Sequence, residues 1–367
     1  MKYTYNERDF DIKRYPSTTN KSLQPWNAAD ELTLEFIKNL KEVPESPVLI
    51  NDRFGFLATT LFKLQPLSVV NHKSHQKAIE RNYIANSLVL KSRTIYTPLE
   101  SLPDIDLGVI KIPKSLEAFD LYLQILHSSL KENGVIVCGF MTKYFTPQLL
   151  QISSKYFEDI QQTKAKKKAR LLILKNKKEV KHQTLTLKIK FDNKEYIQYP
   201  GVFSSDHIDY ATQFLLEHLT VKESEHIILD LASGNGVIAD HILNQQPSSE
   251  VHLMDDSYLA VESSKLNVNE GAYFHWNDTL ENFEDRYLDL VVSNPPFHFE
   301  YETNIEVTLG LFRQVYRCLK ESGRFVLVSN KHLNYKTHLD KLFETCSIIS
   351  ENDKFIIYEC LKQKIEE

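Results

Sequence analysis

The sequence lacks the features that mark membrane, secreted and metal-binding proteins. No apolar run approaches the ~20 residues that a transmembrane helix needs, and the chain begins without a hydrophobic signal region. The cysteines form no Cys-x-x-Cys pair and are scattered at Cys138, Cys318, Cys346 and Cys360. His207, His218 and His241 show no metal-ligand spacing. We therefore expect a cytoplasmic protein with no membrane association, no disulfide framework and no metal, and we favour a monomer.

The net charge of −5 conceals an uneven distribution along the chain. Residues 1–200 carry 31 Lys and Arg against 21 Asp and Glu (+10), and residues 201–367 carry 13 against 28 (−15), which together give −5. Nearly all the positive excess lies in residues 164–190, where eleven basic residues meet one acid, Glu179. This asymmetry favours contact between the first half and a polyanion, although a solvated charged surface is the alternative.

The length of 367 residues predicts two domains. In the second half, strand-like and helix-like segments alternate, which is typical of a doubly wound α/β sheet. The predicted strands are 226–231, 250–255, 272–276, 287–293, 324–329 and 355–360. Predicted helices run from the glycine turn to about 246, from Ser257 to 269, and over 304–320.

The first half repeats this rhythm more faintly. A strand-like segment begins at Pro47, but only Gly55 remains of a glycine turn, and residues 106–114 and 134–140 resemble two later strands. We therefore predict two tandem doubly wound, Rossmann-like domains. Residues 1–190 would form the first domain, in which the glycine turn has degenerated, and residues 191–367 the second.

A set of glycines and acids follows the strands of the second half. Gly234 and Gly236 permit a tight turn that a ligand can approach closely, and Asp230 precedes them. Asp255 and Asp278 follow the next two strands, where carboxylates can meet ribose hydroxyls and an adenine amino group. An ordinary tight strand-to-helix turn, or a dinucleotide site, would account for the glycines alone.

The segment Asn294-Pro295-Pro296-Phe297 carries the strongest chemical signal. Proline fixes φ and has no N–H, so the turn presents mainly acceptors, namely carbonyl oxygens and the Asn294 side chain. Phe297 adds an aromatic face. Such a surface suits a planar group that carries an NH2, such as a nucleobase. A dinucleotide site leaves this turn unexplained, whereas S-adenosyl-L-methionine (SAM) accounts for both motifs.

Together these motifs resemble the class I SAM-dependent methyltransferases that modify the guanine N2 amine in ribosomal RNA. Further similar segments extend the resemblance over nearly the whole chain and are closest to the large-subunit methyltransferase G family; the small-subunit methyltransferase C family is related. These segments are Arg14-Tyr-Pro, Leu23 to Asp30, Gly201 to Ser204 with Ile208-Asp209, Asp255 to Ser257, and Ser263 to Val268. The resemblance also implies that residues 1–190 form a degenerate methyltransferase-like domain that binds RNA, and that residues 191–367 form the catalytic domain.

The resemblance assigns roles to individual residues. Asp230, Gly234 and Gly236 would line the methionine end of SAM, Asp255 would bind its ribose and Asp278 its adenine edge. Phe203 and Ser204 would border the cofactor, and Asn294, Pro295, Pro296 and Phe297 would hold the target base. This sequence departs from the family pattern at Ala232, Ser233 and Ala239, which replace Gly, Cys and Gly.

These observations predict methylation of a guanine N2 in 23S ribosomal RNA, with Lys166, Lys167, Lys168 and Arg170 contacting RNA phosphates. Methylation of 16S RNA is the alternative within the same chemistry. Methylation of an adenine N6 or a glutamine amide is a second alternative, because similar turns serve those reactions. A non-catalytic RNA-binding assembly factor is a third.

Overall fold

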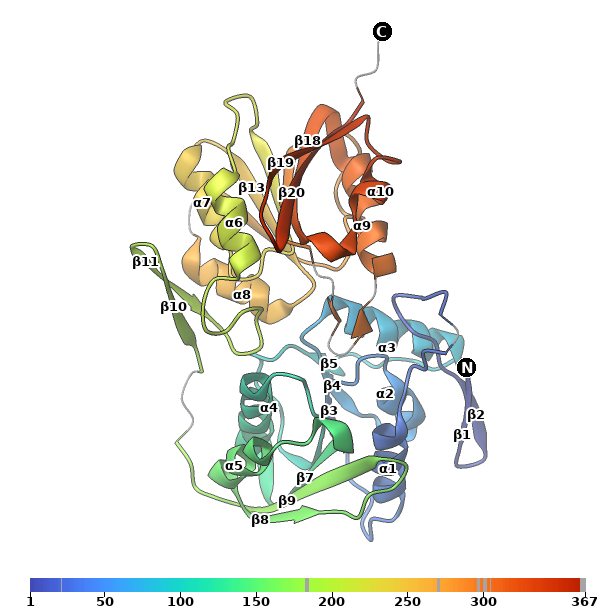
Figure 1. Cartoon of the computed structure of the whole chain (residues 1–367). Helices are drawn as coiled ribbons and strands as arrows, with labels where there is room; N and C mark the ends of the chain where they lie inside the picture. The colour runs from blue at the N-terminus through green and yellow to red at the C-terminus, as the bar shows by residue number, and fades with distance from the viewer. Residues whose placement is uncertain are drawn as a thin grey trace. The chain divides into compact units, whose positions relative to one another are not determined.

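The computed structural model describes residues 1–20, 22–181, 185–268, 271–295, 298–299, 302–303 and 305–363. The chain divides into two compact units, Met1–Leu185 and Thr186–Glu367 (Figure 1). Within the described residues, each unit contains a mixed seven-stranded sheet, which confirms the predicted tandem α/β fold. The functional division predicted at residues 190 and 191, with RNA binding before it and catalysis after it, stays a prediction.

The sheet of the C-terminal unit has the strand order β14-β13-β12-β15-β18-β20-β19. Five strands are parallel: β12 (Ile227–Leu231), β13 (Glu250–Asp255), β14 (Ala272–Trp276), β15 (Leu288–Ser293) and β18 (Leu319–Asn330). β20 (Phe355–Leu361) and β19 (Thr345–Glu351) complete the sheet in antiparallel pairing. The chain proceeds from β12 through β13 to β14 and then returns to the other side of β12. The reversal of strand order therefore lies between β12 and β15, and ligands bind in doubly wound sheets at this point.

Helices of the C-terminal unit cover the sheet, whose parallel strands are apolar on both faces. Ile228 and Val292 belong to one core cluster, while Leu229 and Val291 belong to a second cluster on the opposite face. The helices are α6 (Tyr210–His218), α7 (Val237–Gln245), α8 (Tyr258–Asn267), α9 (Ile305–Cys318) and α10 (Lys336–Leu339), with the 3-10 turn η3 (Lys331–Leu333). Two hairpins complete this unit, β10 (Leu187–Phe191) with β11 (Lys194–Gln198), and β16 (His298–Phe299) with β17 (Glu302–Thr303).

The N-terminal unit repeats the topology, with the strand order β5-β4-β3-β6-β7-β9-β8. Its strands are β3 (Val48–Ile50), β4 (Leu67–Val69), β5 (Ile95–Tyr96), β6 (Ile105–Lys111), β7 (Leu130–Met141), β8 (Phe157–Gln162) and β9 (Ala169–Lys177), beside the hairpin β1 (Lys2–Tyr5) and β2 (Arg8–Asp11). Its helices are α1 (Ala28–Lys38), α2 (Phe56–Thr60), α3 (Lys73–Ala85), α4 (Leu116–Ser129) and α5 (Pro147–Tyr156), with the 3-10 turns η1 (Phe62–Leu64) and η2 (Thr142–Tyr144). The faint repeat in the sequence therefore reflects two copies of one topology.

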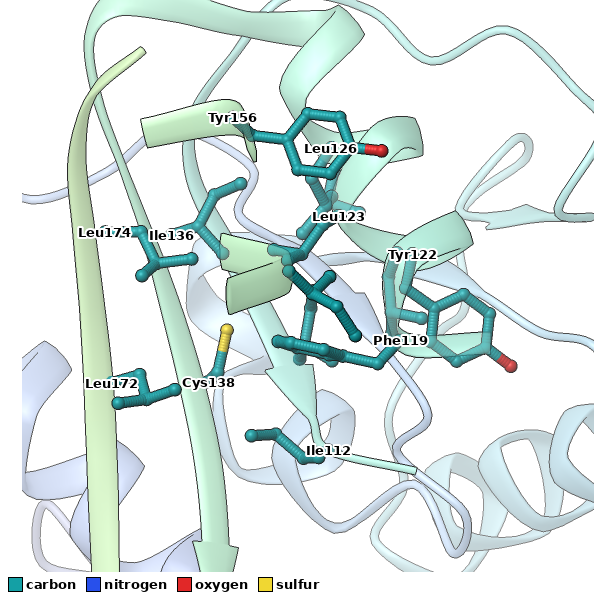
Figure 2. Packing of buried hydrophobic residues seen from close by; sticks show 14 of the residues in the cluster. Ile112, Phe119, Tyr122, Leu123, Leu126, Ile136, Cys138, Tyr156, Leu172 and Leu174 are labelled. Carbon is teal, nitrogen blue, oxygen red and sulfur yellow. The ribbon is translucent and has the colours of Figure 1, made fainter. Parts of the chain in front are cut away.

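The core of the N-terminal unit lies between α4, α5 and the sheet. Figure 2 shows Phe119, Leu123 and Leu126 of α4 beside Ile136 of β7 and Leu174 of β9. These side chains are at most 2 % exposed. Because α4 repeats its apolar residues at helical spacing, one face of the helix is buried against the strands. The N-terminal unit therefore has a packed hydrophobic core of its own.

Two expectations from composition can be compared with the structure. Cys346 and Cys360 lie directly opposite each other on β19 and β20 and form a disulfide, whereas Cys138 and Cys318 are free and buried. The scattered cysteines gave no sign of this pair, because the antiparallel register that brings its members together is set by the fold. Across the described ranges, no helix is long and apolar enough to cross a membrane.

Candidate active site

The glycine turn leads from β12 into α7 and is bound to the end of β13. The backbone N–H groups of Ala232 and Ser233 both donate to the carbonyl of Met254, at 2.8 and 3.1 Å. Gly234 and Gly236 adopt φ of +56° and +84°, in the left-handed region that favours glycine. Ala232, where the family pattern has glycine, also adopts a positive φ of 63°. The predicted strand-turn-helix is therefore present at the switch point.

The two glycines serve different purposes. A Cβ at Gly236 would lie 3.0 Å from Ser264 and Val268, so Gly236 allows α7 to pack closely against α8. A Cβ at Gly234 would meet nothing within 4 Å. Gly234 therefore leaves open space beside a left-handed backbone, and this space is available to a ligand.

Asp255 ties the glycine turn to the start of α8. Its Oδ2 accepts a hydrogen bond from Gly234 N at 3.0 Å, and its Oδ1 accepts one from Ser257 N at 2.8 Å. Ser257 is the N-cap of α8, as the sequence predicted. The Asp255 carboxylate, which remains partly exposed, is thus oriented by two backbone donors at the carboxyl end of β13.

Asp230 is a fully buried acid beneath the turn. Its Oδ2 accepts a hydrogen bond from Ala239 N at 3.1 Å, whereas Oδ1 is buried and has no partner within the described part of the chain. Burial, with a smaller contribution from the nearby charge of Asp255, raises the pKa of the Asp230 carboxyl to about 8. An unpartnered buried oxygen and a raised pKa both fit a group that meets a positively charged ligand.

We expect Asp230 to make the stability of the C-terminal unit depend on pH. Because its pKa is raised on folding from 3.8 to about 8, its stabilising contribution is complete below about pH 4 and is lost as the pH rises through 8. Relative to Asp230→Asn, the wild type should lose up to about 1.4 kcal/mol of unfolding free energy per pH unit in that window. Denaturant titrations in a Trp26→Phe background would measure it, since Trp276 is then the remaining tryptophan. Parallel pH profiles for the two proteins would contradict this expectation.

The remaining predicted cofactor residues lie on nearby segments. Asp278 follows β14 and is partly buried; its backbone N–H donates to Asn277 Oδ1 at 3.0 Å. The side chain of Phe203 is 64 % exposed, and Ser204 Oγ donates to the carbonyl of His207. Asp278 thus stands beside Asp255 in strand order, while Phe203 and Ser204 belong to the loop before α6.

A buried glutamine that we did not predict joins that loop to the glycine turn. Gln198, fully buried, donates from Nε2 to the carbonyl of Ser204 at 3.2 Å and accepts from Asn235 Nδ2 at 2.9 Å. Asn235 lies between the two glycines. The loop carrying Phe203 and Ser204 is therefore held to the turn, although no sequence motif had marked Gln198.

Asn294 follows β15 directly, and its side-chain amide is fixed. Its Nδ2 donates to Asp209 Oδ2 at 3.0 Å and to Thr212 Oγ1 at 2.9 Å. Both amide hydrogens are thereby used, and Oδ1 is left to accept. Pro295 is buried next to Asn294. Pro296 and Phe297, the other predicted members of this turn, lie outside the described residues.

Residues 164–168 of the basic segment form the turn of a hairpin in the N-terminal unit, between β8 and β9. Lys167 and Lys168 adopt positive φ of 50° and 62° at the tip, between β8 and β9. Lys166 and Lys167 form ion pairs with Glu35 (2.5 Å) and Glu31 (2.9 Å) of α1. Arg170 donates to Gln162 Oε1 at 2.7 Å, and the Lys168 ammonium has no partner among the described residues. Part of the positive charge counted in the sequence is therefore neutralised by acids distant along the chain.

The equivalent edge of the N-terminal sheet differs at the glycine turn and at the end of β6. Gly55, like Gly236, is a left-handed N-cap, but the residue two positions earlier is Arg53 where the C-terminal unit has Gly234. Lys111 at the end of β6 forms an ion pair at 2.8 Å with Asp30, which is 2 % exposed. The open space at Gly234 thus has no counterpart among the described residues here. No group of His, Cys, Asp or Glu in the described ranges is arranged to hold a metal ion.

The residues at the carboxyl ends of β12 and β13 fit SAM. The buried Asp230 oxygen can meet its positive charge, Gly234 leaves room for its backbone, and Asp255 presents a carboxylate suited to ribose hydroxyls. Asn294 lies beyond β15, the neighbour of β12 on the other side, so a group held there would be close to the same edge.

Comparisons with known proteins agree over the full chain. Residues 1–179 match the RLMG N-terminal domain, and residues 193–359 match the methyltransferase small domain. The ribosomal RNA large subunit methyltransferase G of Yersinia enterocolitica is 33% identical over 97% of this chain and 93% of its own length. The protein of that name from Psychromonas ingrahamii is 29% identical over 96% of both chains.

A solved structure shares the fold. It is the T. thermophilus 16S rRNA N2 G1207 methyltransferase in complex with AdoMet and guanosine, with a TM-score of 0.76, 19% identity, and coverage of 99% of this chain and 98% of its own. At this identity the likeness concerns the tandem fold alone. The family follows from the full-length relatives: the chain belongs to the ribosomal RNA large subunit methyltransferase G family.

Proposed function

We propose that this protein transfers a methyl group from SAM to the exocyclic N2 amine of a guanine in 23S ribosomal RNA. It is a methyltransferase, and its methyl donor is SAM. The assignment to an exocyclic amine rests on the Asn294 amide. Both of its N–H groups donate within the protein, so Oδ1 is left to accept. The two full-length relatives are both named as large-subunit methyltransferases, which supports 23S over 16S RNA.

The proposed chemistry needs positioning more than proton transfer. SAM supplies an already activated methyl group, so the protein must mainly align the amine with it. Asn294 Oδ1 and the Pro295 carbonyl would accept hydrogen bonds from the two amine hydrogens and draw the nitrogen lone pair out of conjugation. The proton that the amine loses once the bond to methyl has formed would pass to solvent. The base would leave its stack to reach the pocket, and Phe297 with Pro296, outside the described residues, would supply the replacement surface.

The proposed cofactor contacts follow the strand ends. Asp230, Gly234 and Gly236 would hold the methionine portion, Asp255 the ribose and Asp278 the adenine edge, with Phe203 and Ser204 at the border. These roles are supported by the orientation of Asp255 and by the space at Gly234. The requirement for ribosomal RNA agrees with the cytoplasmic location expected from the sequence.

We further propose that Lys166, Lys167, Lys168 and Arg170 contact RNA phosphates without choosing the base. Replacing all four with neutral residues should flatten the dependence of log K on log salt by up to about four contacts' worth. Fluorescence anisotropy with an rRNA fragment at several salt concentrations would measure the slope. The methylated nucleotide should stay the same, because the base would be selected by the groups around Asn294.

A charge-matched variant controls for net charge. It neutralises four exposed lysines elsewhere in the same unit, namely Lys91, Lys114, Lys131 and Lys155. The control should keep the wild-type slope. An unchanged slope in the four-residue variant would show that the hairpin is a solvated surface that pairs with α1 and does not contact RNA phosphates. A shifted methylation site would show that the hairpin takes part in base recognition.

Two measurements test the proposed function against its alternatives. Isothermal titration with SAM separates a working enzyme from a non-catalytic assembly factor, since a retired site should not bind it. Mapping of methylated nucleotides in a strain lacking the gene then identifies the product. Loss of one N2-methylguanine from 23S RNA supports the proposal; loss from 16S RNA, or of an N6-methyladenine, supports an alternative.

A further inference from the structure

The start of α6 fixes the one side chain on which the proposed chemistry depends. Asp209 is the N-cap of α6, and Thr212 is the third residue of that helix. They reach Asn294 across 85 and 82 residues of sequence, and each accepts one hydrogen bond from its Nδ2. Thr212 is buried, at 6 % exposure. These contacts are therefore a built feature of the fold around Asn294.

The chemistry of Asp209 decides which end of the amide faces it. An ionised carboxylate accepts hydrogen bonds and cannot donate them, so Asp209 can face the NH2 end of Asn294 but would repel its oxygen. A flipped amide would place Oδ1 against this carboxylate and lose that contact, whereas the Thr212 hydroxyl can donate as well as accept and would tolerate either end. The orientation is thus set by charge, and Oδ1 is the end left to accept from a substrate.

The backbone on either side of Asn294 is also constrained. Ser293, fully buried, donates from Oγ to the carbonyl of Leu231 at 2.7 Å, which joins the ends of β15 and β12. Pro295 fixes its own φ and restricts the residue before it. Asn294 can then move mainly by rotation of its side chain. Its hydrogen bonds to Asp209 and Thr212 prevent that rotation.

We propose that Asp209 and Thr212 are positioning residues that hold the Asn294 amide with Oδ1 aimed at the acceptor amine and strengthen Oδ1 as a hydrogen-bond acceptor. The strengthening follows because donation of both N–H bonds polarises the amide. This inference rests on the proposed function, since it assigns a purpose to the Asn294 acceptor. It adds Asp209, the N-cap of α6, and Thr212, in the first turn of that helix. The resemblance included Asp209 but assigned neither residue a role in the reaction.

The test uses variants that keep the helix intact. Thr212→Val preserves shape and removes the acceptor, and Thr212→Ser restores it. Asp209→Ser keeps a good N-cap but is too short to replace the carboxylate contact. Thr220→Val, the same chemical change beyond the end of α6, is the matched control. For each full-length protein, kcat and KM for RNA and the Kd for SAM are measured.

We expect a fall in kcat of roughly 3- to 10-fold for Thr212→Val and 10- to 100-fold for Asp209→Ser, with SAM affinity within about twofold of wild type. Thr212→Ser should restore kcat. In the Asn294→Ala background, Thr212→Val should cause no further loss, because its effect passes through Asn294. A merely structural threonine would instead lower SAM affinity or cause an additional loss in that background.

The outcomes separate this inference from the proposed function. If Asn294→Ala is strongly impaired while Thr212→Val and Asp209→Ser turn over at wild-type rates, the positioning role is wrong and the proposed function stands. Losses that multiply with Asn294→Ala also refute the positioning role. If wild-type protein methylates no RNA, the proposed function fails first, and the inference fails with it.

Discussion

Replacement of Asn294 by alanine should lower kcat for RNA methylation on the order of 10²-fold or more, the effect of losing one preorganised polar contact at a reacting centre. SAM affinity should change little. The reason is that the Asn294 amide is held by Asp209 and Thr212 rather than by the turn at Gly234 and Gly236. An interaction made with the amine as it reacts appears in kcat, whereas a cofactor contact appears in binding.

Single-turnover methylation of rRNA and SAM titration, measured on the same preparation, would check both parts. Asn330→Ala is a suitable control, because Asn330 ends β18, a neighbouring strand of the same sheet. The control should retain its activity. Survival of half the wild-type rate in Asn294→Ala would show that the assignment of the turn to the amine is wrong.

Replacement of Asp255 by alanine should weaken SAM binding by roughly 1–3 kcal/mol, which is the cost of leaving polar partners unpaired. Its carboxylate accepts from Gly234 N and Ser257 N, so the variant also loosens the turn. Asp255→Asn keeps an acceptor for one of these donors and should therefore lose less. Isothermal titration measures both affinities.

The stoichiometry of SAM binding should be one per chain, in the C-terminal unit. The N-terminal unit has the same strand order, but Arg53 stands where Gly234 leaves room, and the Lys111–Asp30 ion pair occupies the end of β6. One similarity remains: the buried Asp52 accepts a hydrogen bond from Ala58 N at 2.8 Å, as Asp230 does from Ala239 N. Because an arginine stands in the N-terminal unit where the C-terminal unit has Gly234, we expect no SAM binding in the N-terminal unit.

Asp256→Ala is the matched control for Asp255→Ala, because it removes the neighbouring carboxylate. It should leave SAM affinity close to that of wild type. Equal losses in the two variants would indicate a general charge effect, and unchanged affinity in Asp255→Ala would refute the ribose role. A stoichiometry of two would show that the N-terminal unit still binds the cofactor.

Local patterns predicted what depends on local sequence. The strand-turn-helix at Gly234 and Gly236, the N-cap at Ser257 and the strand leading to Asn294 follow from residue order, so the tandem sheet and the edge of the site could be read from the chain. The repeat in the first half was recognisable although its glycines were lost, because the apolar strands needed for the core remain.

Contacts between distant segments could not be predicted in this way. Asp209 and Thr212 reach Asn294 only once α6 lies beside the end of β15, and no sequence pattern had pointed to Thr212. Likewise, the pairing of Lys166 and Lys167 with Glu35 and Glu31 spans more than 130 residues. The charge count of the basic segment therefore overstated its unpaired charge.

Methyl transfer in vitro measures the proposed methylation of a guanine N2 amine. Purified protein is incubated with SAM carrying an isotopically labelled methyl group and with 23S and 16S RNA from a strain lacking the gene, and the RNA is digested to nucleosides. We expect labelled N2-methylguanosine from 23S RNA and none with Asn294→Ala. Label in N6-methyladenosine, in 16S RNA alone, or in no nucleoside would contradict it.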